Sequence, residues 1–194
     1  KEQKPAGSFT LVTVPLDLAT IMGSGVKAAK AVHVTADDSV TVVALNYLMY
    51  SSDATLILPR HLAGSNYTVV AYKESILPSE CVVVAYEDNT AVRITPSVPT
   101  LEGRAAGVPF TITLNMGDMY QLQANDDLTG TQITSDGANC GKIAVFGGAM
   151  WTWVGPCEYG NHLYEQLYPV ESWGRAYALL PMLTREKDRF RILA

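Results

Sequence analysis

Hydrophobic and polar residues alternate with a period of two along much of the chain. The two clearest runs are Phe110–Leu114 and Val92–Thr95, in which apolar side chains take every second position. Successive side chains of a β-strand point to opposite faces of the sheet, so this alternation predicts strands with one face in the core and one in water. The chain is also rich in Val, Ile and Thr, which pack well on a pleated surface.

Four further runs are more continuously apolar, which predicts strands covered on both faces or nearly so: Val40–Leu45, Tyr67–Tyr72, Cys81–Tyr86 and Ile143–Phe146. Short turns rich in Asp, Asn, Ser or Gly separate several runs, and their length suits hairpins: Ala36–Ser39, Glu87–Thr90 and Asn115–Asp118. The pattern contains no strong helix signal, and the best candidate is Asn161–Tyr168, because Leu163 and Leu167 stand four residues apart before Pro169. The pattern predicts an all-β fold of short antiparallel strands, either a β-sandwich-type module or a small β-propeller-like arrangement.

The chain also resembles itself. Pro59–Gly64 is followed by Tyr67, three residues beyond the glycine, and Pro169–Gly174 is followed by Tyr177 at the same spacing. The shared spacing Pro-x4-Gly-x2-Tyr, found in the same order among similar neighbours, predicts an internal duplication.

The duplication divides the chain and predicts an exposed edge. We expect an N-terminal arm with a first strand over 1–31, a first β unit over 32–132 and a second β unit over 133–194. The apolar run Cys81–Tyr86 of the first copy corresponds to Arg189–Ala194 of the second, but only the first copy continues into a further turn and strand. The second unit is therefore expected to be truncated, with an unpaired strand edge at Arg189–Ala194.

Composition narrows the class of protein. Of 194 residues, 48% are hydrophobic and 17% charged, which predicts a packed core and excludes a disordered chain. A formal net charge of −5 argues against a general nucleic-acid binder. No apolar run has the length of a membrane-spanning helix, so no membrane insertion is expected. The polar start Lys1–Pro5 is unlike a signal peptide, which favours a mature or excised piece of chain.

No catalytic motif is present, and we predict that the chain is not an enzyme. It has neither a nucleophile elbow nor a phosphate loop. The three histidines are scattered and favour strand or loop roles over that of a general base: His33, His61 and His162. A less favoured alternative is a carbohydrate-active enzyme that uses Asp126 or Asp127 with Glu158 or Glu165. That chemistry needs two carboxyl groups facing each other across a cleft at roughly 5–10 Å.

Metal and cysteine chemistry give weak signals. No Cys or His pair has the spacing of a zinc site, so no metal site is predicted. Asn125–Asp127 offers oxygens to calcium but lacks the spaced ligands of a recognised loop. Cys140 and Cys157 flank a strand and a Trp-rich loop, and a disulfide between them would close the base of that loop. The alternative is that all three cysteines are buried thiols in a reducing compartment. Cys81 starts an apolar strand and is expected to pack as a small buried hydrophobic residue.

An aromatic stretch offers the best candidate for binding. Trp151, Trp153 and Tyr159 lie close together among glycine and proline residues. They either cover the open end of a sandwich or form a partner-binding surface, since Trp and Tyr anchor interfaces and stack on sugars. Asn66 opens an Asn-Tyr-Thr sequence, an N-glycosylation acceptor if the source glycosylates secreted proteins.

Ten segments, in order and spacing, carry a resemblance to a known family: Ser52–Pro59, Leu62–Tyr67, Glu87–Thr90, Gly107–Thr111, Asp127–Thr131, Ile143–Gly148, Cys157, His162–Leu167, Trp173–Gly174 and Phe190–Leu193. From about Val32 to Ala194 the chain resembles the N-terminal domain of IgG Fc-binding proteins. The resemblance implies a non-catalytic extracellular or cell-surface module for binding or adhesion, part of a larger protein, with a protein or glycoprotein ligand.

A structural role is the alternative function. The edge expected at Arg189–Ala194 and the polar arm Lys1–Ser8 suit strand exchange between copies, which would build an extracellular fibre or sheath.

Overall fold

The structure, a computed structural model, describes residues 7–136, 141–156, 159–181 and 188–194. Almost all regular elements are strands: β1 Val26–Ala29, β2 Val42–Leu48, β3 Ser51–Ile57, β4 Asn66–Thr68, β5 Ser79–Ala85, β6 Thr90–Thr95, β7 Phe110–Leu114, β8 Asp118–Ala124, β9 Gln132–Asp136, β10 Ile143–Thr152 and β11 Asn161–Gln166. Within these residues the helical elements are one short α-helix, α1 Leu16–Ala19, and two 3₁₀ turns, η1 Arg60–Leu62 and η2 Val170–Ser172. The expected all-β class is confirmed. In the described part of the chain, no helix combines the length and apolar character that a membrane span requires.

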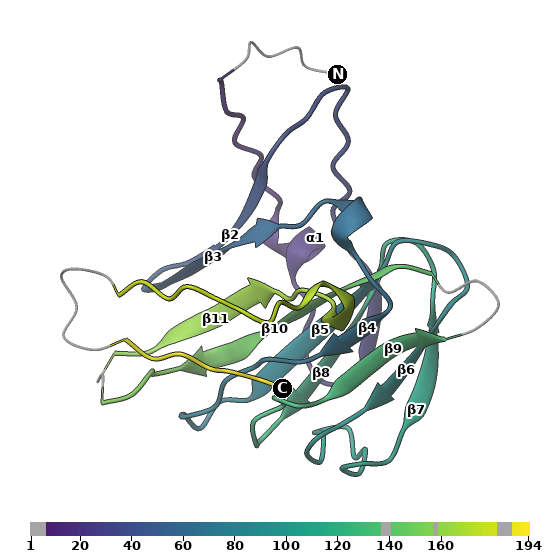
Figure 1. The fold of residues 1–194 in the computed structure, drawn as a ribbon, viewed down its shortest axis with the longest axis vertical. Helices are drawn as coiled ribbons and strands as arrows, with labels where there is room; N and C mark the ends of the chain where they lie inside the picture. Colours follow the sequence, from purple (N-terminus) through teal and green to yellow (C-terminus); the bar gives the residue numbers. More distant parts are fainter. Residues whose placement is uncertain (1–6, 137–140, 157–158, 182–187) are drawn as a thin grey trace.

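Two antiparallel sheets pack face to face as a β-sandwich (Figure 1). One has the strand order β1-β8-β5-β10-β11 and the other β4-β9-β6-β7. Fully buried aliphatic side chains from both sheets form the core between them: Val83, Leu122, Ile143 and Val145 from the first, and Val92, Ile94, Leu114 and Ile133 from the second. Cys81 lies in this core as a free thiol, as predicted, and burial raises its pKa to about 12.

The turns at Glu87–Thr90 and Asn115–Asp118 exist, but they do not close hairpins. The first joins β5 to β6 and the second joins β7 to β8, and each pair of strands belongs to different sheets. In a sandwich both sheets contribute apolar faces to one core, so a short turn serves equally well to cross between layers. The hairpin prediction is therefore wrong at these two turns.

The candidate helix over Asn161–Tyr168 is not formed, because Asn161–Gln166 is strand β11. It pairs with β10, with Gly148 opposite Tyr164. Two leucines four residues apart are compatible with a helix or a strand, and here backbone pairing with β10 stabilises the strand.

The outer edge of β11 is covered by the side chains of β3 instead of by another backbone. Alternate residues of β3 accept hydrogen bonds from alternate backbone N–H groups of β11: Ser51 from His162 at 3.2 Å, Asp53 from Tyr164 at 2.8 Å and Thr55 from Gln166 at 3.0 Å. The period-two repeat of both strands makes these spacings match. The contact gives hydrogen-bond acceptors to backbone N–H groups at the outer edge of β11. It also fixes the β2–β3 hairpin beside the β10–β11 hairpin.

The prediction that the run Val40–Leu45 is covered on both faces is wrong. Strand β2 pairs with β3 alone among the described strands. On its outer face Val43 and Leu45 are each 62% exposed and Tyr47 is 74% exposed. The hairpin extends beyond the sandwich (Figure 1), so no second layer packs on this face within the described residues.

The two copies of the repeated motif have the same local structure. Each proline precedes a 3₁₀ turn, η1 or η2, with nearly equal backbone angles: φ −64° and ψ 149° at Pro59, φ −66° and ψ 150° at Pro169. In each copy the glycine N–H donates to the tyrosine hydroxyl, at 3.0 Å for Tyr67 and 2.6 Å for Tyr177. The copies differ in burial, since Tyr67 is 1% exposed and Tyr177 73%. The likeness supports duplication, while the boundaries 32–132 and 133–194 stay a prediction.

Candidate functional site

The predicted aromatic residues lie at the tip of the β10–β11 hairpin. The rings of Trp151 and Trp153 meet edge to face with centroids 5.6 Å apart. Both are half-buried, whereas Tyr159 is 85% exposed. The Trp151 ring lies against Gly160, where a Cβ would come within 2.0 Å of it. The tryptophans therefore pack against each other at the tip, and Tyr159 presents its ring to solvent. Partner binding by these three residues stays a prediction.

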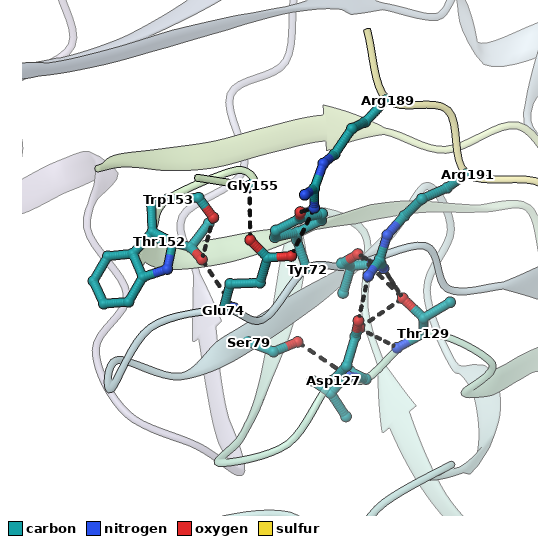
Figure 2. Close-up of polar contacts among 12 residues, drawn as sticks. Tyr72, Glu74, Ser79, Asp127, Thr129, Thr152, Trp153, Gly155, Arg189 and Arg191 are labelled. Carbon is teal, nitrogen blue, oxygen red and sulfur yellow. Dashed lines mark hydrogen bonds and ion pairs between the residues drawn. The ribbon is translucent and has the colours of Figure 1, made fainter. Parts of the chain in front are cut away.

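A charged network holds this tip in place (Figure 2). The Glu74 carboxylate accepts a hydrogen bond from the Gly155 N–H at 2.8 Å and pairs with Arg189 at 3.0 Å. The backbone N–H of Glu74 donates to Thr152 Oγ1 at 3.1 Å. One acidic residue thus joins the loop before β5, the loop that follows Trp153 and the C-terminal segment.

Acid should loosen this network. The Gly155 N–H, with Tyr72 and Arg189, lowers the pKa of Glu74 below its ordinary value of 4.5. A carboxyl whose pKa is lowered by folding stabilises the fold above its unfolded pKa and loses that contribution as pH falls through its folded pKa. We expect a change in tryptophan fluorescence below pH 4.5. Glu74→Gln should abolish this change and Asp126→Asn should retain it; an unchanged transition in Glu74→Gln would contradict the assignment.

The tip of the β2–β3 hairpin lies beside the first. Asn161 Nδ2 donates to the carbonyl of Ser52 at 2.7 Å, and Ser51 Oγ lies 2.6 Å from both Asn161 Oδ1 and His162 Nδ1. This second tip exposes large side chains: Tyr47 at 74%, Met49 at 68% and Tyr50 at 95%. Tyr50 lies in the turn between β2 and β3 and has a positive φ of 70°.

We call the large side chains of these two neighbouring tips the aromatic tip surface: Tyr47, Met49, Tyr50, Trp151, Trp153 and Tyr159. Sequence reasoning found the second half of this set and missed the first. The available signal was the run Tyr47–Tyr50 at the end of β2, next to polar Ser51 and Ser52, where a tight turn would place the rings in solvent. Large exposed aromatic side chains that neighbour one another are typical of an interaction surface.

The carboxyl groups predicted for a carbohydrate-active enzyme are not part of the aromatic tip surface. Burial acts to raise the pKa of Asp127, but its bonds to Arg191 at 2.8 Å and to Thr129 at 2.7 Å lower it overall. Burial raises the pKa of Glu165, which accepts a hydrogen bond from Thr55 at 3.0 Å. Asp127 lines a cavity of about 350 Å³ and Glu165 a second of about 250 Å³, with Arg191 lining both. Asp126 is exposed and Glu158 lies outside the described residues.

The other predicted residues fall at scattered places. The described residues contain no group of three or more His, Cys, Asp or Glu side chains placed to hold a metal ion. Calcium at Asn125–Asp127 stays a prediction. The suspected disulfide between Cys140 and Cys157 lies outside the described residues. Asn66 begins β4 at the edge of its sheet with a half-buried side chain, and its glycosylation stays a prediction.

Comparisons with known proteins agree on one family. The family model described as "IgGFc binding protein" matches residues 53–194. The IgGFc-binding protein of Homo sapiens is 27% identical over 162 residues, which is 81% of this chain. The chain spans only 3% of the length of that relative. No solved structure matches the chain.

Proposed function

Because the chain belongs to the IgGFc-binding protein family, we propose that it is a non-catalytic extracellular module that binds proteins or glycoproteins. In this proposal it is one part of a larger secreted or cell-surface protein and contributes to adhesion. The family supplies the class of partner.

The observation that carries the proposal is the aromatic tip surface. Tyr50 and Tyr159 are 95% and 85% exposed on two hairpins that hydrogen bonds hold side by side. Tyrosine offers a large contact area with few rotatable bonds and a hydroxyl for hydrogen bonding, which makes it well suited to protein interfaces. Asn161 and the β3–β11 contacts keep the two tips in fixed relative positions, so little ordering cost is expected on binding.

Binding should depend on the exposed rings and not on the fold. We expect the double variant Tyr50→Ser/Tyr159→Ser to lose partner binding by about tenfold or more, with unchanged thermal stability. Immobilised immunoglobulin Fc is the first probe, because the family is named for it, followed by secreted glycoproteins compared between variant and wild type. Met116→Ser is the matched control, since Met116 is 61% exposed and lies in the turn between β7 and β8, which carries no residue of this surface.

Trp151→Ser separates packing from recognition in the same assay. Its ring covers Gly160 and meets Trp153, so its removal should lower stability. Partners retained equally by the wild type and by the double tyrosine variant would contradict the proposed surface.

A further inference from the structure

Two segments of the chain present strand edges that have no ladder partner among the described residues. Strand β2 is bonded along one edge only, to β3. Residues 188–194 run as an extended segment across the sandwich and belong to no sheet (Figure 1). The two segments are not paired with each other.

The C-terminal segment is held in a defined orientation. Arg191 donates to the carbonyl of Ala71 at 2.6 Å, pairs with Asp127 at 2.8 Å and lies over the Tyr72 ring at 4.4 Å (Figure 2). The alternate side chains Phe190 and Ile192 are 50% and 88% exposed. The segment is therefore fixed to the sandwich through its arginines, while Phe190 and Ile192 remain exposed.

The internal repeat identifies which strands these two segments correspond to. Alignment of Arg189–Ala194 with Cys81–Tyr86 makes Phe190 the counterpart of Val82, which lies opposite Phe146 in the β5–β10 ladder. Phe146 in turn pairs with Gln166. Gln166 is the counterpart of Leu56, since each is the third residue before the proline of its copy, and Leu56 pairs with Val43. The β5–β10 ladder thus has a counterpart between residues 188–194 and β2, with Phe190 opposite Val43.

We propose that β2 of one copy pairs antiparallel with residues 188–194 of a second copy, which builds a closed two-fold dimer. The contact is reciprocal, since each copy supplies both segments, and it places exposed Val43 on exposed Phe190. Strand β2 carries no charged residue that would oppose edge pairing. Neither segment has a ladder partner among the described residues, so a second copy would supply a partner to both. The dimer does not depend on the proposed ligand binding. It differs from the fibre considered in the sequence analysis, because the two reciprocal contacts close the assembly at two copies.

The second copy of the repeated motif fits the same arrangement. Tyr67 donates to the carbonyl of Ile143 at the start of β10, at 2.8 Å. Ile143 pairs with Ala85, and the alignment that relates Phe146 to Val43 relates Ile143 to Val40, just before β2. The exposed Tyr177 hydroxyl would therefore donate to the carbonyl of residue 40 of the second copy, as the Tyr67 hydroxyl donates to the carbonyl of Ile143.

Sedimentation of the chain over increasing concentration tests the dimer. We expect the wild type to approach twice the monomer mass. Val43→Lys and Ile192→Lys should weaken association by about tenfold or more, because each places a charge in the new sheet. Tyr177→Phe should also weaken it, and Ile76→Lys should associate like the wild type. A wild type that stays monomeric at the highest concentration would overturn the proposal.

Cross-linking tests the register independently of any loss of association. Mixing a Val43→Cys chain with a Phe190→Cys chain and oxidising should give a disulfide between residues 43 and 190, located by peptide mapping. Mixing Val43→Cys with Ile76→Cys should not. A bridge found only within a single chain that carries both cysteines would show that the edge is filled by its own chain and would overturn the exchange between copies.

Discussion

Gly147→Ala is expected to destabilise the protein by about 3 kcal/mol or more, a cost at the upper end for added volume in a packed interior. A Cβ at Gly147 would lie 2.1 Å from the carbonyl oxygen of Val70 and 3.4 Å from Leu167. The obstacle is backbone, which cannot move aside like the end of a flexible side chain. The free energy of unfolding from urea denaturation measures the effect.

Gly174→Ala is the matched control for that substitution. Neither Gly147 nor Gly174 has a positive φ, so alanine strains neither backbone. At Gly174 the nearest atoms to a new Cβ are those of Tyr177 at 3.4 Å, an ordinary contact. We expect a change within about 0.5 kcal/mol. A similarly small change in Gly147→Ala would mean that Val70 does not cross β10 as the structure shows.

This crossing also links the core to the candidate site. Residues 69–72 pass over β10 at Gly147, and Tyr72 N–H donates to the carbonyl of Gly148 at 3.4 Å. Two residues later Glu74 reaches Gly155 at the hairpin tip. Because the crossing sets the position of Glu74, we expect Gly147→Ala to disturb the aromatic tip surface as well as the core.

The sequence predicts the sandwich well where local pattern and tertiary role agree. Phe110–Leu114 alternates and is a strand over that same range. The local hydrophobic pattern does not predict an element whose structure depends on a partner far along the chain. Strand β3 was not anticipated, because its polar residues Ser51, Asp53 and Thr55 look like those of a loop. Their role as hydrogen-bond acceptors for the edge of β11 depends on a strand that lies far along the chain.

The candidate site was predictable to a similar extent. The cluster of Trp151, Trp153 and Tyr159 is visible because its members are close in sequence. Tyr47 and Tyr50 join it only through the hydrogen bonds of Ser51 and Ser52 to Asn161, which no local spacing reveals. The repeat was informative for a different reason, since Pro-x4-Gly-x2-Tyr encodes a local structure that forms twice whatever its surroundings.

That difference in surroundings makes Tyr67→Phe and Tyr177→Phe a sharp comparison. The Tyr67 hydroxyl accepts from the Gly64 N–H at 3.0 Å and donates to the Ile143 carbonyl at 2.8 Å, inside the core. Removing it leaves two partners unsatisfied, and we expect a loss of about 2 kcal/mol in the free energy of unfolding. Tyr177 is 73% exposed, so water replaces its contacts and Tyr177→Phe should cost less than about 0.5 kcal/mol in the dilute monomer.

The pH dependence of this comparison identifies the hydroxyl itself. Burial raises the pKa of Tyr67 from 10.0 to about 12. A phenol whose pKa is raised by folding contributes its stabilisation below its unfolded pKa and loses it as pH rises toward its folded value. The stability advantage of wild type over Tyr67→Phe should therefore shrink between pH 10.0 and about 12, whereas Tyr177→Phe should follow the wild type throughout. An advantage that stays constant over this range would assign the loss to packing around the ring instead of to the two hydrogen bonds, and the first copy of the motif would then hold β10 by shape alone.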